Sequence, residues 1–234
     1  MKILFKKWVF LALSLGFFTL FSCTARVDGT LAANGSAVLT INMSLGQRIT
    51  SLIRSFSAAG GQQTDQVLDG SSIAKSMTGS PGISSVTFRN TSASAVEGQI
   101  RISHIGEFLS GGSFIIFEQK NSGGRCVINL NRENAQAVLA NLSSEITDYL
   151  VAILAPIAID DEMTKTEYLD LVTSFYSKVV SDEIASSRIR ASIDFPANIT
   201  AVKGGTSSGR KAIFDIPLVD LLVLETPLNY EVTW

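Results

Sequence analysis

The sequence predicts an α+β fold in which strands from both ends of the chain form a mostly antiparallel sheet and a helical middle segment packs on it. Residues 37–45 and 228–234 alternate between apolar and polar side chains, as half-buried strands do. Between them, residues 131–179 place apolar side chains at helical spacing. Strands that flank a helical middle favour a single α+β unit, and we expect residues 23–234 to form that one domain.

Residues 1–22 have the composition of a bacterial lipoprotein signal peptide. Three lysines precede the apolar residues 8–21, and Ser22 supplies a small residue before Cys23. A membrane-spanning helix needs about 20 apolar residues, more than this leader offers. We therefore expect palmitate-type acylation of Cys23, which attaches the protein to a membrane of the bacterial cell envelope, at its periplasmic face or outer surface. An ordinary secretory leader and an uncleaved short anchor are the alternatives.

The mature chain is expected to open with a β-hairpin over residues 26–45, because Asn34-Gly35 is a strong two-residue turn signal. The apolar residues of 49–56 follow helical spacing on one face, and a short helix is expected over residues 71–77. Four strands joined by turns come next, over residues 83–90, 95–103, 113–119 and 125–130.

The middle of the chain contains an unusually apolar helical stretch. Asn131 caps one helix, and a second runs over residues 144–155 until Pro156 stops it. Residues 146–159 leave so little polar surface that the helix is either buried all round or lines a ligand pocket or partner interface. The candidate ligand or partner residues are Tyr149, Leu150, Ile153, Leu154 and Ile157.

A long helix and further strands complete the chain. Thr164 opens the helix with a capping box, and its apolar stripe includes Phe175 and Val179. The strands that follow are expected over residues 188–195, over 199–203 paired with 210–217 across a Gly/Ser-rich turn, and over 228–234.

Two serine motifs provide catalytic alternatives. Residues 205–209 match G-x-S-x-G around Ser207, but strand-like sequence follows, and the single histidine, His104, precedes the serine, so a hairpin turn is expected. Ser72 and Lys75 match S-x-x-K without the partner motifs of penicillin-recognising enzymes. We expect a protein without catalytic activity, and a serine hydrolase using Ser207 or Ser72 is the alternative.

Composition and charge argue against several classes of partner. Of 19 lysines and arginines, three lie in the leader, so the remainder is outweighed by 21 acidic residues, which argues against nucleic acid. One histidine cannot build a multi-histidine metal site, and acylation of Cys23 removes any zinc-type cluster. Cys126 alternates with Ile128 and Leu130, as a buried strand thiol does. We expect no metal and no cofactor.

The two ends of the chain resemble known lipoproteins. A lipobox precedes Arg-Val-Asp-Gly-Thr-Leu at residues 26–31, and Asp-Ile-Pro-Leu at 215–218 precedes a terminal strand that ends in Trp234. The combination looks like the uncharacterised lipoproteins of spirochaetes, and it is more distantly similar to the LppM-like bacterial lipoprotein domain. This likeness implies an α+β envelope domain that handles lipid or lipoglycan.

We therefore expect an acyl-anchored, non-catalytic envelope protein. It would be held at the membrane by the acyl groups of Cys23. It would bind an apolar or lipid-like ligand or an envelope protein partner through the apolar middle helix. A structural assembly factor that takes no small ligand is the alternative.

Overall fold

The computed structural model describes residues 24–59, 66–109, 114–120, 123–139 and 144–234. Its strands are β1 (Thr24–Leu31), β2 (Ala37–Ser44), β3 (Ile83–Ser92), β4 (Ala95–Ile102), β5 (Ile115–Lys120), β6 (Gly123–Leu130), β7 (Arg188–Asp194), β8 (Ala201–Lys203), β9 (Thr206–Ser208), β10 (Lys211–Pro217) and β11 (Leu228–Thr233). Its helices are α2 (Gln47–Ala59), α3 (Gly70–Met77), α4 (Ile105–Leu109), α5 (Arg132–Leu139), α6 (Ser144–Ala152), α7 (Pro156–Ile159), α8 (Lys165–Phe175), α9 (Lys178–Ser186) and α10 (Leu218–Val223).

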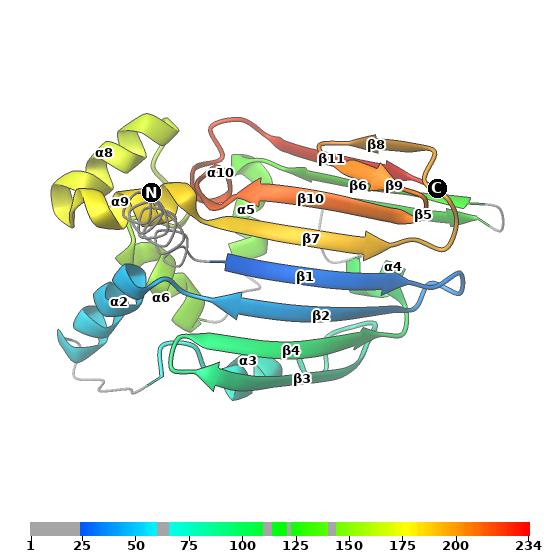
Figure 1. Ribbon diagram of the computed structural model, residues 1–234, viewed down its shortest axis with the longest axis horizontal. Helices are drawn as coiled ribbons and strands as arrows, with labels where there is room; N and C mark the ends of the chain where they lie inside the picture. The colour runs from blue at the N-terminus through cyan, green and yellow to red at the C-terminus, as the bar shows by residue number, and fades with distance from the viewer. Residues whose placement is uncertain (1–23, 60–65, 110–113, 121–122, 140–143) are drawn as a thin grey trace, which may run out of the picture.

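The fold is α+β, as the sequence predicts, and its strands form two mostly antiparallel sheets. Within the described residues, a seven-stranded sheet has the order β3-β4-β2-β1-β7-β10-β9 and a four-stranded sheet has the order β5-β6-β11-β8 (Figure 1). The larger sheet joins the N-terminal hairpin to the C-terminal strands through β1 and β7, which run parallel. Helices from the middle of the chain pack on the strands at one end of this sheet (Figure 1).

The predicted N-terminal hairpin is confirmed. β1 and β2 pair antiparallel from Thr24 opposite Ser44 to Leu31 opposite Ala37. Gly35 takes a φ of 79°, which glycine adopts without steric cost, and the Asn34 side chain accepts a hydrogen bond from the Ser36 backbone N–H at 3.1 Å.

Two hydrophobic cores stabilise the molecule. One lies between the sheets and buries Trp234, whose ring centroid is 4.7 Å from that of Phe195 and 5.9 Å from that of Phe117. The other lies among the helices and is centred on fully buried side chains such as Tyr168 and Ile184. The terminal strand β11 is paired on both edges, with β6 and β8, so it is an interior strand of its sheet.

The prediction of one long helix after Thr164 is wrong, because the structure has two shorter helices there. The capping box of Thr164 and Glu167 is present, but the helix ends at Phe175, and α9 starts separately. Ser177 is extended, and its hydroxyl accepts a hydrogen bond from the Val180 N–H, so it caps a new helix. The break turns Phe175 and Val179 into solvent instead of toward the core.

The strand pairing predicted for residues 199–203 is also wrong. β8 pairs with β11, and it is β9 that pairs with β10. The chain passes from one sheet to the other at Gly204, where φ is 77° and a Cβ atom would lie 2.6 Å from the Tyr230 ring. Ser207 therefore lies on a short strand, opposite Ala212, and not in a hairpin turn.

The apolar middle stretch forms two helices and not one. α6 ends at Ala152, Leu154 takes a left-handed φ of 55°, and Pro156 begins α7 instead of ending a helix. Proline suits the first helical position because its missing N–H has no partner there.

Candidate functional site

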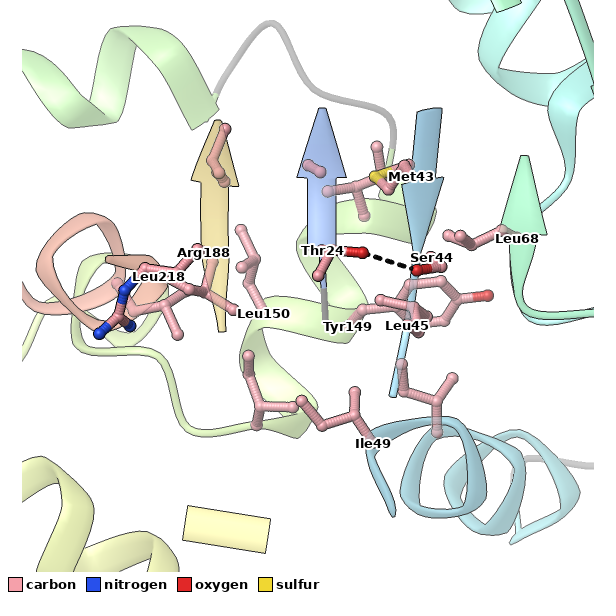
Figure 2. A pocket seen from close by; sticks show the side chains of 16 residues that line it. Thr24, Met43, Ser44, Leu45, Ile49, Leu68, Tyr149, Leu150, Arg188 and Leu218 are labelled. Carbon is pink, nitrogen blue, oxygen red and sulfur yellow. Dashed lines mark hydrogen bonds between the residues drawn. The ribbon is translucent and has the colours of Figure 1, made fainter. Parts of the chain in front are cut away.

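An apolar pocket of about 190 Å³ lies where the ends of β1, β2 and β7 meet the helices α2, α6 and α10. Figure 2 shows the lining side chains, which converge from both the strands and the helices. The lining residues are Thr24, Ala25, Met43, Ser44, Leu45, Ile49, Ile53, Leu68, Ile146, Tyr149, Leu150, Ile153, Arg188, Ile189, Leu218 and Leu222. Most of these side chains are aliphatic, so water inside the pocket finds few hydrogen-bond partners.

The strand ends present only a few polar groups to the pocket. The Thr24 and Ser44 hydroxyls lie 3.0 Å apart in a hydrogen bond across the β1–β2 pair (Figure 2). Each hydroxyl therefore has a hydrogen-bond partner within the protein, and this part of the lining does not require a polar ligand group.

A buried carboxylate positions α2 at the pocket. Glu183 of α9 is buried, and its oxygens accept hydrogen bonds from the backbone N–H groups of Arg48 at 3.1 Å and Ile49 at 2.9 Å. These donors lie in the first turn of α2, where backbone N–H groups have no partner within the helix and negative charge is favourable. A Cβ atom at Gly46 would collide with this carboxylate. The contact fixes the end of α2 that carries Ile49 and Ile53 into the pocket.

Two tyrosines hold the end of α6. The Tyr168 hydroxyl donates to the Ile153 carbonyl oxygen at 3.0 Å, and the Tyr176 hydroxyl donates to the Ala152 carbonyl oxygen at 2.6 Å. Burial raises the pKa of the Tyr168 phenol, so it remains a protonated donor. These bonds satisfy carbonyl groups that the end of the helix leaves free, and they keep Tyr149, Leu150 and Ile153 at the pocket.

One cationic side chain stands among the lining residues. The Arg188 guanidinium donates to the Ala185 and Ser187 carbonyl oxygens, both at 2.9 Å. Within the described part of the chain, no carboxylate forms an ion pair with Arg188. The guanidinium is exposed, so its charge is available to an anionic group outside the pocket.

The structure brings together three of the five residues that the sequence singled out. Tyr149, Leu150 and Ile153 line the pocket, whereas Leu154 and Ile157 do not. Leu154 is half-buried at the left-handed turn between α6 and α7, and Ile157 packs against the helical core. Cys23 lies outside the described residues, although its chain neighbour Thr24 lines the pocket.

Sequence reasoning missed the lining residues that come from strand ends and from α10. Ile49 and Ile53 carried a signal, since both lie on the apolar face of the first predicted helix. Arg188, Ile189 and Leu218 carried none, because their place depends on which strands pair.

The catalytic alternatives lie elsewhere. Ser72 is half-buried in α3, and Ser207 is exposed on β9. Among the described residues, no group of three or more His, Cys, Asp or Glu side chains is placed to hold a metal ion. Burial raises the pKa of the Cys126 thiol to about 11, so the thiol is protonated at neutral pH.

Comparison with known proteins gives one distant structural likeness. No family model matches the chain, and no curated protein matches its sequence. The NMR structure of the folded domain of LppM from Mycobacterium tuberculosis is similar to this chain. The match covers 91% of this chain and 89% of the LppM chain, with 8% sequence identity and a TM-score of 0.43. A likeness at this level carries no information on ligand or activity. In the described residues, no helix is long and apolar enough to cross a bilayer.

Proposed function

We propose that this protein is an acyl-anchored, non-catalytic lipoprotein of the bacterial cell envelope that binds a lipid-like ligand in the pocket beside Thr24. The observation that carries the proposal is the lining of that pocket, where Arg188 is the only charged residue among the 16. The leader, which ends in Ser22-Cys23, supports the anchor.

The size of the pocket favours part of an acyl chain. An enclosed apolar cavity of about 150 Å³ takes a ligand the size of benzene, and pockets for whole drug-sized ligands measure roughly 300–1,000 Å³. At about 190 Å³, this pocket suits a short stretch of methylenes. The rest of the ligand then lies outside, where Arg188 is suited to pair with a phosphate or carboxylate head group.

Metabolic labelling with a fatty acid that carries a diazirine and an alkyne tests both parts of the proposal. Before irradiation, label on the Cys23 peptide reports the anchor, and Cys23→Ser should remove it. After irradiation, label that fragmentation maps to Tyr149 or Ile153 reports an acyl chain in the pocket. A cross-link between the Cys23 peptide and α6 identifies the protein's own acyl chain as the occupant. Label on α6 alone identifies a separate lipid.

A matched pair of variants on α6 controls this experiment. Leu150→Trp fills the pocket and should lower the light-dependent label more than about tenfold, because two displaced methylenes at about 0.8 kcal/mol each exceed that factor. Asp148→Trp changes an exposed residue of the same helix that lies outside the lining, and should leave the label unchanged. Equal label in both variants contradicts the pocket assignment and favours an assembly factor without a small ligand.

A further inference from the structure

Five large apolar side chains are exposed on helices in the described residues; one is Ile159 of α7, 37% exposed, and the other four lie on α2, α6, α8 and α9. Phe56 of α2 is 46% exposed, Val151 of α6 44%, Phe175 of α8 68% and Val179 of α9 53%. Each residue comes from a different helix, so the exposure does not result from the position of a single helix. We call these four residues the apolar face.

Contacts around Tyr176 join three of the helices that carry this face. The Tyr176 ring meets the Phe56 ring edge-on, with 6.2 Å between centroids. Its hydroxyl binds the carbonyl oxygen of Ala152, the chain neighbour of Val151, and its backbone N–H binds the Val172 carbonyl oxygen at 2.9 Å. Helices α2, α6 and α8 therefore meet at Tyr176, and α9 begins two residues later at Lys178.

The apolar face lies at the end of the sheet where the chain enters the fold. Figure 1 shows α2, α6, α8 and α9 gathered at the end where β1 begins. Thr24, the first residue of β1, shares the pocket lining with residues of α2 and α6. A single extended residue spans at most about 3.6 Å, so an acyl group on Cys23 holds this end of the domain against the bilayer.

The charged residues of α8 and α9 beside the apolar face provide little electrostatic attraction to anionic lipid. Lys178 forms an ion pair with Asp182, one turn further along α9, at 2.6 Å. Attraction to anionic lipid requires a cluster of basic residues, and the sequence of α8 and α9 alternates Lys165 and Lys178 with acids such as Asp170. At α8 and α9, contact with a membrane would therefore depend on apolar burial more than on charge.

We propose that the apolar face lies in the interfacial layer of the membrane that anchors the protein, so that the helical end and the pocket beside it face lipid. Exposed apolar patches mark protein or membrane contacts, and helices that lie at a membrane surface bury Phe and aliphatic side chains at the boundary between head groups and acyl chains. Because the expected anchor at Cys23 is the chain neighbour of Thr24, we favour a membrane over a protein partner as the surface that the apolar face contacts. This inference rests on the acyl anchor of the proposed function, which is tested separately by the label on Cys23.

Quenching by brominated lipid tests the inference on the acylated protein. The full chain is purified from its host and reconstituted into phosphatidylcholine vesicles whose acyl chains carry bromine, and flotation with the vesicles confirms the anchor. Phe175→Trp places a fluorophore on the apolar face. Ile116→Trp, at a residue 52% exposed on β5 of the smaller sheet, is the matched control. Removal of the leader takes Trp8 with it, so the parent protein emits from the buried Trp234, and this emission is subtracted from both.

We expect Phe175→Trp to lose emission in brominated vesicles and to shift its maximum to the blue, whereas Ile116→Trp keeps the emission it has in unbrominated vesicles. Val179→Trp is a second reporter and should follow Phe175→Trp. Equal quenching of the Phe175 and Ile116 variants in a protein that floats overturns the inference and leaves the anchor intact. If the emission maximum of the Phe175→Trp variant shifts to the blue only at high protein density in the vesicles, a second copy of the protein covers the apolar face. That result also overturns the inference. A protein that does not float removes the anchor, and the inference fails with it.

Discussion

Replacing Trp234 by alanine should cost about 3–5 kcal/mol of unfolding free energy, because a large buried aromatic side chain is removed from between the two sheets. The residue is 5% exposed and contacts the rings of Phe117 and Phe195. In a domain of about 200 residues, each kcal/mol shifts the melting temperature by roughly 2–4 °C, so a fall of about 6–20 °C is expected. Thermal unfolding followed by circular dichroism measures it.

A double-mutant cycle separates this packing from a general effect of truncation. A Cβ atom at Gly124 would collide with the Trp234 indole, 2.7 Å from Cε2, and would lie 2.8 Å from the Glu118 carbonyl oxygen. Gly124→Ala should therefore cost about 1–3 kcal/mol in the parent, through overpacking. In the Trp234→Ala background the collision with the ring is gone while the contact with the Glu118 carbonyl oxygen remains, so the part of the cost that the ring causes should disappear. Costs that add within about 0.5 kcal/mol would refute the assigned contact.

Three further predictions follow from single sites. Glu183→Gln should lower the unfolding free energy by about 1–3 kcal/mol in urea titration, because the first turn of α2 loses a charged acceptor; an unchanged midpoint contradicts the cap. The Cys126 thiol, with its pKa raised from 9.0 to about 11, should react with iodoacetamide about 100-fold more slowly than an ordinary thiol at pH 8, and the stability its protonation gives should fall as pH rises from about 9 to about 11. Ser207→Ala and Ser72→Ala should leave any measurable activity of the protein intact; a loss of several orders of magnitude in either variant, with the melting temperature retained, revives the hydrolase alternative.

The elements that sequence predicted well are those whose signals are local. Asn34-Gly35 sets the turn between β1 and β2, and the capping box of Thr164 and Glu167 sets the start of α8. In each case the hydrogen bonds that define the element join residues within a few positions of each other. The alternating pattern of β11 also gave the right answer, since Val232 and Trp234 are buried and Asn229 is exposed.

The errors in the predicted helices arose where the helical spacing of apolar residues continues past the end of one helix and into the next. Phe175 and Val179 keep the spacing of Tyr168 and Val172, so periodicity alone extends α8 across Ser177. Ser177 carries a capping signal, but a serine inside an apolar pattern is ambiguous until the new helix is seen. If the apolar face meets lipid, the same pattern has a different cause: the residues are apolar for the membrane and not for the core.

The pocket could not be predicted because its walls come from pairings that no local pattern encodes. The register of β1 and β7 places Thr24 beside Arg188, 164 positions later in the chain. Periodicity identified one wall, α6, and also selected Leu154 and Ile157, which belong to the same apolar stretch but lie beyond the break.

Strand direction explains why the helices gather at the end where β1 begins. β1 starts at this end, β2 runs antiparallel to it and finishes here, and α2 follows directly. β7 is parallel to β1, so α9 must finish at this end, and β10, antiparallel to β7, delivers α10 here as well. Once β1 begins beside Cys23, this order of strands places the helix termini, the apolar pocket and the apolar face beside the expected anchor. The parallel pairing of β1 with β7 is therefore the feature on which the proposed function and the membrane-facing surface both depend.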